Sequence, residues 1–594
     1  MRIARLLAPV GAILGFVFPV HAADGDRDWP LYGLDYGNTR YSALAAIDRG
    51  NVAKLVPRWS YHTGMKDTFQ ATPIVVDGTM YVSTPWNHVV ALDAATGKER
   101  WHYEHPIEDQ ATCCGPANRG VAVGDGLVYM ATLDAHVVAL DAKTGTKRWE
   151  TPLADKSTAG SEQLAQLLGE RELEGAKQTG HTGITANMAP QIVDGLVLAG
   201  VTGAGYGLHV EIKEKGETLL SVAGLGGENM GLRGFLVALD AKTGREVWRW
   251  YVVPEHGWEG AFVTKTADGA PLDRDVAAER AAFERYPETW RYGGGSVWTT
   301  PAIDRARGLL YLGTGNPAPQ MDDSTRPGDN LNTISLVALE LKTGKLRWAY
   351  QQVPHDRWGY DVASPPVLTT VTVNGKPREV VGEASKTGWF YLHDRDTGEL
   401  VLKSEAFVPQ QNLFKRPTPD GVLIQPSAYG ACSWSPAALD AAGHRAYVAG
   451  IHHPAFYYSR KLEPQPGRPW TSYTFFKPEA GTAYGLLSAI DLESGRIAWQ
   501  TKTPQPLLGG VLATAGGLLF TGEGNGEVSA FDAGDGRKLW SHKASAGANA
   551  PPVTYRVGGT QYVAIAAGGN LLYGYATGDE IIAFALPGDT AKKP

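Results

Sequence analysis

Several features are scarce or missing in this chain of 594 residues, and each absence narrows its class. Charged residues make up only 20% of the sequence, which disfavours a protein built of long charged helices. The net charge is −7, so the basic patches that bind nucleic acid are not expected. Beyond the N-terminus no apolar run reaches the roughly 20 residues of a membrane helix. No Cys-x-x-Cys-His sequence occurs, so we expect no attached c-type haem.

The N-terminus has the pattern of an export signal. Arg2 and Arg5 precede an apolar stretch, 6–20, that ends in a small-x-small cleavage site. We therefore expect residues 1–22 to be a cleaved signal peptide and 23–594 to be a single exported domain, periplasmic in a Gram-negative bacterium. An uncleaved N-terminal anchor is the alternative.

Glycine, proline and tryptophan are abundant. The chain has 72 glycines and 37 prolines, a composition typical of many short strands joined by tight turns. Single hydrophobic cores usually stop growing at about 250–300 residues, so one domain of this length is expected only in a repeat architecture. The chain also has 17 tryptophans, and many of them recur at matching positions.

A repeated segment decides the predicted fold. Its pattern is apolar-Ala-Leu-Asp-x-x-Thr-Gly-x-x-x-Trp, in which a strand ends at Asp, the turn follows, and a returning strand carries Trp on its buried face. The copies are Val90 to Trp101, Val138 to Trp149 and Val237 to Trp248, with looser copies at Val337 to Trp348, Ala489 to Trp499 and Ser529 to Trp540, and a copy without Trp at Tyr391 to Gly398.

Each hairpin is followed by another pair of short apolar strands, as in residues 73–82, which gives four strands per unit. Such a sheet has two apolar faces that it cannot bury alone, and propellers bury them by arranging four-stranded blades around a channel. Seven copies, plus a blade that joins the N-terminal strand region to residues 581–584, predict an all-β, eight-bladed β-propeller. Seven blades, or a two-sheet sandwich, are the alternatives.

Three charged segments interrupt the repeats: 157–177, which favours a helix, and the similar segments 211–225 and 268–286. We expect them to be surface insertions that shape the mouth of the channel.

Further motifs point to one family. With them the sequence resembles the pyrroloquinoline-quinone (PQQ) alcohol dehydrogenases over nearly the whole mature chain. They are Asp28-Trp29-Pro30, Asn38-Thr39-Arg40-Tyr41-Ser42, Cys113-Cys114-Gly115-Pro116-x-x-Arg119-Gly120, Gly313-Thr314-Gly315-Asn316-Pro317-x-Pro319, Arg326-Pro327-Gly328-Asp329-Asn330, Pro354-His355-Asp356-x-Trp358 and Leu512-Ala513-Thr514-Ala515-Gly516-Gly517.

The resemblance implies a cofactor site. In the family, PQQ lies between a disulfide of two adjacent cysteines, which match Cys113 and Cys114, and a tryptophan plane, which matches Trp298. Adjacent cysteines can close a strained, rigid ring. Because Cys432 is the one other cysteine, the chain can form at most one disulfide, and pairing with Cys432 is the alternative. Trp298 by itself would fit a core position equally well.

Three further matches complete this site. Arg119 corresponds to a residue that pairs with a cofactor carboxylate, for which a guanidinium is well shaped. Lys386 corresponds to a basic residue near the quinone oxygens, and Asn316 to a calcium ligand. Taken alone, they are equally a surface Arg, an ordinary Lys and an Asn in a Gly-rich turn.

The sequence also departs from the family. Gln70 replaces a glutamate that contacts the cofactor, and in Thr202-Gly203-Ala204-Gly205 the glycine replaces a calcium-binding glutamate. We still expect Thr202, Gly203 and Ala204 to contact the cofactor. Gly359 replaces the proposed general base. Asp361 lies two residues further on, on the same side of an extended chain, and is our candidate base; Asp356 is another.

Two functions follow from this comparison. In the first, the protein is a PQQ- and Ca²⁺-dependent dehydrogenase that oxidises an alcohol, polyol or sugar hydroxyl by hydride transfer to the quinone and passes electrons to a separate cytochrome or quinone acceptor. In the second, the propeller retains the fold and acts as a binding scaffold or in another reaction, because a fold does not fix a function. The substrate and the oligomeric state cannot be read from the sequence.

Overall fold

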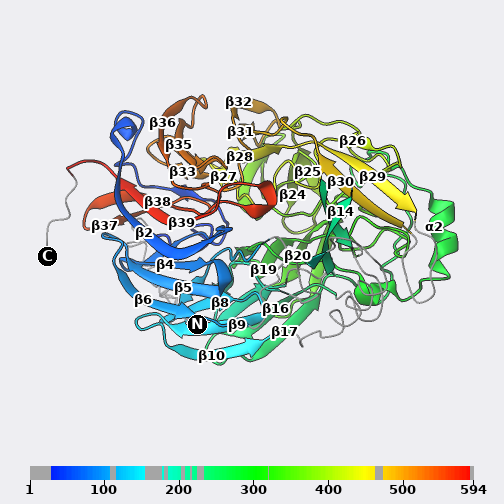
Figure 1. Cartoon of the computed structure of the whole chain (residues 1–594), viewed down its shortest axis with the longest axis horizontal. Helices are drawn as coiled ribbons and strands as arrows, with labels where there is room; N and C mark the ends of the chain where they lie inside the picture. Colours follow the sequence, from blue (N-terminus) through cyan, green and yellow to red (C-terminus); the bar gives the residue numbers. More distant parts are fainter. Residues whose placement is uncertain are drawn as a thin grey trace, which may run out of the picture.

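The computed structural model describes residues 28–107, 115–153, 177–178, 185–201, 208–214, 217–223, 233–318, 320–461 and 472–588. These residues form an all-β protein in which consecutive sheets follow one another around the molecule (Figure 1). The chain ends meet in one sheet, where red β39 lies beside blue β2. The predicted signal peptide and cleavage site lie outside the described residues.

Eight antiparallel sheets of four strands carry the architecture, and we number them 1 to 8 in chain order. Sheets 1 to 4 are β3–β6 (Ile74–Val76, Thr79–Thr84, His88–Asp93, Glu99–Glu104), β7–β10 (Ala122–Gly124, Leu127–Ala131, His136–Asp141, Lys147–Pro152), β12, β13, β16 and β17 (Gln191–Val193, Leu196–Gly200, Phe235–Asp240, Glu246–Tyr251), and β18–β21 (Ala302–Asp304, Leu309–Gly313, Ser335–Glu340, Leu346–Gln351).

Sheets 5 to 8 are β22–β25 (Val367–Val373, Lys376–Ala384, Phe390–Asp394, Leu400–Lys403), β27, β28, β31 and β32 (Ala438–Leu439, Arg445–His452, Tyr484–Asp491, Ile497–Thr503), β33–β36 (Leu512–Thr514, Leu518–Gly522, Glu527–Asp532, Lys538–Lys543), and β2 with β37–β39 (Val56–Asp67, Val553–Val557, Thr560–Ala567, Gly578–Ala585). The short β1 (Tyr41–Ser42) adds a parallel fifth strand to sheet 7. Sheet 8 confirms the predicted pairing of the N-terminal strand with residues 581–584.

The repeated motif forms the predicted hairpin between the third and fourth strands. In sheet 1, Oδ1 of Asp93 accepts hydrogen bonds from the backbone N–H and the hydroxyl of Thr96, at 3.0 and 2.9 Å. The glycine of the motif is needed for two reasons. In sheet 2, Gly145 has a φ of +72°, and a Cβ there would lie 2.7 Å from the ring of Trp101 in sheet 1.

The six motif tryptophans and Trp59 of β2 join neighbouring sheets. Each of these seven indole N–H groups donates to a carbonyl in or beside the next sheet. Seven of the eight junctions are made in this way, and the contact passes from sheet 8 back to sheet 1. The donors and acceptors are Trp59 to Ala94 (3.2 Å), Trp101 to Ala142 (3.0 Å), Trp149 to Ala241 (3.1 Å), Trp248 to Leu341 (3.0 Å), Trp348 to Arg395 (3.0 Å), Trp499 to Ala533 (3.2 Å) and Trp540 to Leu55 (3.0 Å).

The insertions differ in structure. Helix α2 (Val276–Phe283) lies at the edge of the molecule within the predicted segment 268–286 (Figure 1). The described residues of the segment 211–225 instead belong to two antiparallel strands, β14 (Leu208–Glu214) and β15 (Glu217–Ala223), and β14 also pairs with β11 (Lys177–Gln178). This segment had been compared with the helix-prone segment 157–177. Apolar residues in β14 instead alternate with the period of a strand.

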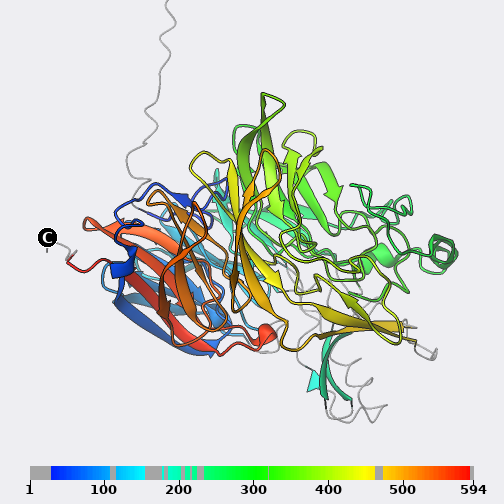
Figure 2. The same cartoon turned by 90° about the horizontal axis from the view of Figure 1, so that it is seen from above.

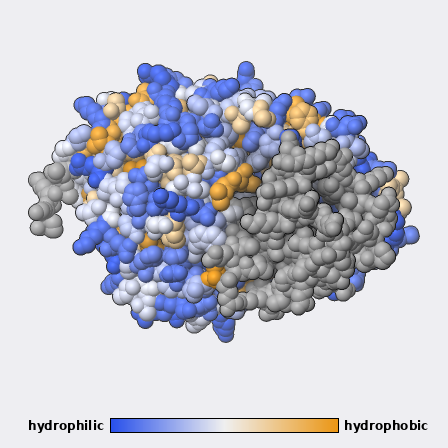
Figure 3. Space-filling view, viewed as in Figure 1, coloured by the Kyte–Doolittle hydropathy of each residue, from blue (hydrophilic) through white to orange (hydrophobic). Residues whose placement is uncertain are grey.

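The remaining elements are short. A second three-stranded sheet contains β26 (Val422–Ile424), β29 (Ala455–Lys461) and β30 (Ser472–Pro478), and the 3₁₀ turns are η1 (Val52–Lys54), η2 (Pro85–Asn87), η3 (Thr289–Tyr292) and η4 (Leu571–Tyr573). From above, the sheets are seen to pack at an angle to one another (Figure 2). The face shown in Figure 3 is mainly hydrophilic, with scattered small apolar patches. No helix among the described residues is long and apolar enough to span a bilayer.

Candidate functional site

One end of the sheets gathers most of the predicted site residues. In an antiparallel four-stranded meander, the start of the first strand and the turn between the second and third strands lie at the same end. Gln70, Arg119, Trp298 and Asp361 precede the first strands of sheets 1, 2, 4 and 5. The turns between the second and third strands of sheets 4 and 5 contain Asn316 and Lys386.

Arg119 and Trp298 lie together, as predicted. The Arg119 guanidinium carbon is 4.7 Å from the centre of the Trp298 ring and 5.7 Å from that of Trp434. Its Nη1 donates to Oδ1 of Asn187 at 2.7 Å and to the Trp298 carbonyl at 3.4 Å. The side chain is buried. A fixed, buried cation beside two indole rings is suited to an anionic, planar ligand.

Asp361 and Lys386 form a buried ion pair. Nζ of Lys386 donates to Oδ2 of Asp361 at 2.7 Å and to the carbonyls of Gly359 and Ala428, both at 3.0 Å. These three acceptors match the three hydrogens of an ammonium group. The position of the Lys386 side chain is therefore fixed by three hydrogen bonds.

Asn316 joins this pair through its backbone. Its N–H donates to Oδ1 of Asp361 at 2.7 Å, and its side-chain Nδ2 donates to Oδ2 of Asp356 at 3.1 Å. Its Oδ1, the atom predicted to bind calcium, accepts from Nε2 of Gln320 at 3.1 Å and retains a second lone pair.

The two candidate bases have different surroundings. Asp356 accepts hydrogen bonds from the backbone N–H groups of Trp358, Gly359 and Tyr360, at 3.1 to 3.2 Å. Burial raises its pKa, but these bonds commit the carboxylate to forming a turn. Asp361 makes its contacts with Lys386 and Asn316 instead, so the geometry favours Asp361.

Gly359 has no room for a side chain. A Cβ at this position would lie 2.9 Å from Cβ of Ala428 and 3.2 Å from Cε of Met321, and the glycine φ is +89°. The backbone path therefore excludes the family's carboxylate at this position. Asp361, two residues further along the chain, is the candidate base.

The two groups of residues are adjacent. A Cβ on Gly315 would lie 2.9 Å from Oδ1 of Asp361 and 3.2 Å from Cβ of Ser296, two residues before Trp298. This proximity places the ion pair and the Arg119–Trp298 pair at a common site.

Buried polar atoms at this end of the sheets lack partners among the described residues. They are Oε1 of Gln70, Oγ of Ser296, Nε1 of Trp434, and both Oδ1 and Nδ2 of Asn549. Buried polar atoms without partners are costly, so these five are available to a polar ligand that enters at this end of the sheets. Sequence analysis predicted Gln70 but missed Ser296, Trp434, Asn549 and Asn187. Their signal is positional, because each lies just before the first strand of a sheet.

Aromatic side chains lie next to this site. Tyr429 stacks on His453 with ring centres 4.2 Å apart, and the Tyr573 hydroxyl donates to the Tyr429 carbonyl at 3.2 Å. Tyr573 meets Trp434 edge-on at 6.2 Å. Burial lowers the pKa of His453 to about 4, so the ring is neutral at pH 7 and this wall is apolar.

Six predicted residues cannot be placed. Cys113, Cys114, Thr202, Gly203, Ala204 and Gly205 lie outside the described residues, so the disulfide and the altered calcium site stay predictions. Gly115, directly after the cysteines, has φ +90° and packs against Thr68, two residues from Gln70.

Comparisons with known proteins identify the family of the chain. Residues 29–146, 226–414 and 406–563 match a family described as PQQ-type glucose/ethanol/alcohol dehydrogenase, beta-propeller domain. A quinohemoprotein alcohol dehydrogenase of Comamonas testosteroni is 33% identical over 96% of this chain and 78% of its own length. Quinoprotein alcohol dehydrogenase PedH of Pseudomonas putida is 30% identical over 90% of this chain and 85% of its own.

Solved structures show the same architecture. The Comamonas testosteroni enzyme superimposes with a TM-score of 0.75 at 30% identity, covering 97% of this chain and 82% of that one. A europium-containing methanol dehydrogenase gives 0.74 at 28% identity, covering 94% and 98%. The chain therefore belongs to the PQQ-dependent alcohol dehydrogenase family, oxidoreductases of the β-propeller class that act on CH–OH donors.

Proposed function

We propose that this protein is an exported, PQQ-dependent dehydrogenase that oxidises the hydroxyl of an alcohol, polyol or sugar. The observation that carries the proposal is the buried Arg119 guanidinium stacked on Trp298, at the end of the sheets where unpartnered polar atoms cluster. PQQ, when bound, accepts the electrons removed from the substrate carbon.

The residues at this site fit such a cofactor. Arg119 provides a guanidinium for a carboxylate, and Trp298 provides a plane against which a flat ring can stack. Nε1 of Trp434 is a buried donor without a described partner, and Asn549 offers both a donor and an acceptor. A planar quinone that carries carboxylates and carbonyl oxygens would satisfy these groups.

A cation is proposed at the same site. Asn316 supplies a carbonyl-type oxygen, the ligand that Ca²⁺ prefers, and Oδ1 of Asp361 lies against the Asn316 backbone. The cation would polarise a carbonyl of the bound quinone. Because one relative is a europium-containing methanol dehydrogenase, a lanthanide is the second cation to test.

Asp361 is the proposed base. It is buried, its Oδ2 accepts from Nζ of Lys386 and its Oδ1 from the Asn316 N–H, and these bonds would position it to accept the substrate hydroxyl proton. Lys386, held by three acceptors, would favour negative charge that develops nearby. The wall of Tyr429, His453 and Tyr573 would limit the access of water.

We also propose that the eight sheets close into an eight-bladed propeller. The relay of tryptophan hydrogen bonds supports this arrangement, since Trp540 joins sheet 7 to sheet 8 and Trp59 joins sheet 8 to sheet 1. The β2–β39 pairing supports it as well, because it brings both ends of the chain into one blade.

Reconstitution tests the function. The metal-free protein is titrated with PQQ and either Ca²⁺ or Eu³⁺, cofactor binding is followed by absorbance, and alcohol oxidation is followed with an electron-accepting dye. We expect binding and turnover in the wild type. Tight PQQ binding without turnover of any alcohol, polyol or sugar would support the alternative, a binding protein that lost the reaction.

The variant Asp361→Asn separates two roles. If Asp361 is the base, its loss should lower kcat by about 100-fold or more and leave the PQQ affinity unchanged. If the variant instead loses PQQ and metal binding with a normal kcat at saturation, Asp361 is a ligand and not the base. Lys386→Arg, which retains the positive charge, serves as the control for disruption of the pair.

Export and electron transfer are tested separately. We expect the protein in the periplasmic fraction of a Gram-negative host, with an N-terminus near Ala23. For the electron acceptor we propose a separate cytochrome or quinone, because the sequence holds no c-type haem motif. Reduction of an added cytochrome c or ubiquinone analogue by the loaded enzyme distinguishes these two.

A further inference from the structure

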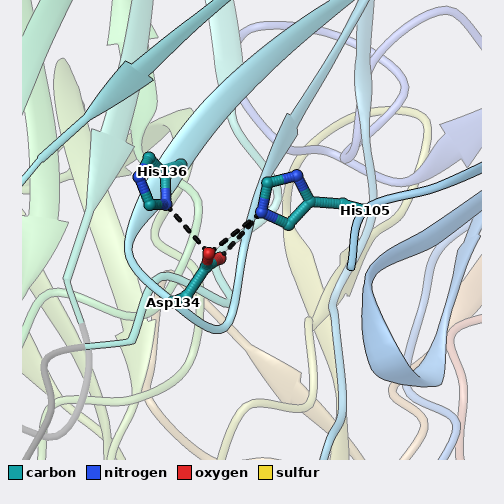
Figure 4. Close-up of side chains that lie close together, drawn as sticks. All are labelled: His105, Asp134 and His136. Atoms are coloured by element: carbon teal, nitrogen blue, oxygen red, sulfur yellow. Dashed lines mark hydrogen bonds and ion pairs between the residues drawn. The ribbon is translucent and has the colours of Figure 1, made fainter. Parts of the chain in front are cut away.

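Two histidines and an aspartate, none of them among the proposed cofactor residues, converge between sheets 1 and 2 (Figure 4). His105 follows β6, Asp134 lies in the β8–β9 turn, and His136 begins β9. Nε2 of His105 lies 3.0 Å from Asp134 Oδ2, and Nδ1 of His136 lies 3.0 Å from the same oxygen. The three ligand atoms all lie within 4.8 Å of one another.

The backbone holds this arrangement in place. Asn87 joins the two segments, because its carbonyl accepts from the His105 N–H at 3.1 Å and its Oδ1 accepts from the Leu133 N–H at 2.8 Å. The Thr132 hydroxyl donates to Oδ1 of Asp134 at 2.6 Å and fixes the carboxylate. Preorganised ligands with a second sphere of hydrogen bonds are characteristic of metal sites.

No basic side chain accompanies the carboxylate of this cluster. Among the ion pairs of the described residues, Asp134 contacts histidines alone, and no Lys or Arg lies within 4.0 Å of it. Two imidazole nitrogens and one carboxylate oxygen form a donor set that suits a first-row transition ion.

We propose that His105, Asp134 and His136 bind a divalent first-row transition ion such as Zn²⁺. Zinc accepts imidazole nitrogens at about 2.0–2.1 Å and carboxylate oxygens at about 2.0–2.2 Å, so the donor atoms of a tetrahedral site lie about 3.3 Å apart. The N–O separations of 3.0 Å need only a small expansion. Side-chain exposures of 6% for His105, 26% for Asp134 and 19% for His136 leave access for an ion and for water as a fourth ligand.

The ion would link two sheets at the site end of the molecule. His105 begins the connection from sheet 1 to sheet 2, and this connection contains Cys113, Cys114 and Arg119. Asp134 and His136 belong to sheet 2. A metal bound by all three would fix the start of the connection against sheet 2, and it would therefore stabilise the protein without taking part in the proposed reaction.

Zinc binding to the full-length mature protein, without PQQ and with excess Ca²⁺, tests this proposal. After treatment with EDTA, the protein is titrated with Zn²⁺ by calorimetry and bound zinc is counted by mass spectrometry. We expect one equivalent and a higher thermal midpoint. Co²⁺ should give the visible spectrum of a four-coordinate N/O site. The absence of stoichiometric Zn²⁺ from the wild type would overturn the proposal.

Variants assign the site. Asp134→Asn and His136→Gln should each weaken Zn²⁺ affinity by about 10-fold or more and abolish the zinc-dependent rise in midpoint. His62→Gln is a matched control, because Nδ1 of His62 also lies 3.1 Å from a carboxylate, Asp579, but without a second histidine.

A second control, His88→Gln, removes one member of an exposed pair in which Nδ1 of His88 lies 2.8 Å from Nε2 of His102. Both controls should bind Zn²⁺ like the wild type. If zinc is lost in a control and retained in both site variants, the assignment is wrong. Because PQQ is absent throughout, this result is independent of the proposed dehydrogenase activity.

Discussion

Restoring the carboxylate of the family at position 359 should damage this protein and not repair it. In Gly359→Asp the new Cβ would lie 2.9 Å from Cβ of Ala428 and 3.2 Å from Cε of Met321. Met321 can move, since it ends in a flexible side chain, but the Ala428 Cβ is fixed by its backbone. The φ of +89° adds strain for any residue with a side chain.

The cost of these two effects to the free energy of unfolding can be estimated. A side chain in the left-handed region costs about 1–2 kcal/mol, and overpacking a core costs about 1–3 kcal/mol. We therefore expect Gly359→Asp to lower the free energy of unfolding by about 2–5 kcal/mol. Gly359→Ala carries the same Cβ and backbone strain without the carboxylate, so it should lose a similar amount.

A relief variant isolates the steric part. Ala428→Gly removes the nearest atom while it retains the Ala428 carbonyl that accepts from Lys386. Combined with Gly359→Asp it should recover about 1–2 kcal/mol, which a double-mutant cycle of urea midpoints measures. Dye-linked oxidation should fall with Gly359→Asp. A Gly359→Asp protein that is as stable as the wild type and turns over faster would refute this reasoning and return the base to position 359.

Three further results are expected. Burial raises the pKa of Glu383 to about 8, so the folded state keeps a proton that the unfolded chain releases, and stability should fall by about 1.4 kcal/mol per pH unit between about 4.5 and about 8. Glu383→Gln should remove this slope. If plots of the urea midpoint against pH are parallel for the variant and the wild type, the prediction is wrong. Trp101→Phe removes one of the two donors to the Ala142 carbonyl, the Tyr81 hydroxyl remaining at 3.1 Å, and should cost about 0.5–1.5 kcal/mol in chemical denaturation. Arg119→Lys loses the forked guanidinium over the Trp298 ring, so PQQ affinity in an absorbance titration should weaken about 10-fold or more. If the variant binds PQQ as tightly as the wild type, the assignment of Arg119 to the cofactor is wrong.

Much of the fold could be predicted because its signals are local. The Asp-x-x-Thr-Gly turn is stabilised by the hydrogen bonds of its own aspartate, as at Asp93, so seven copies identify seven hairpins. The role of Trp was only partly predicted. Trp101 is buried, but its indole bonds to Ala142 of the following sheet, a contact that depends on how sheets stack and not on the repeat itself.

The candidate site was predicted unevenly for the same reason. Arg119 and Trp298 could be named from motifs, and the structure brings them together from sheets 2 and 4. Asn187 and Trp434 could not, since each is an ordinary residue before a first strand and matters only because the packing of the sheets brings it to Arg119. The His105–Asp134–His136 cluster was missed because its members come from two sheets with no continuous motif.

Gly359, which replaces the family's general base, forms one hydrogen-bonded unit with Lys386 and Asp361. The Gly359 carbonyl accepts from Nζ of Lys386 at 3.0 Å, and the φ of +89° lies in the region that favours glycine. That bond, with those to Ala428 and Asp361, uses all three ammonium hydrogens. The carboxylate of Asp361 thus shares Lys386 with two backbone carbonyls, and its other oxygen accepts from the Asn316 N–H. A proton taken up by Asp361 would weaken its contact with Lys386, so in the proposed reaction the two side chains would act as one unit.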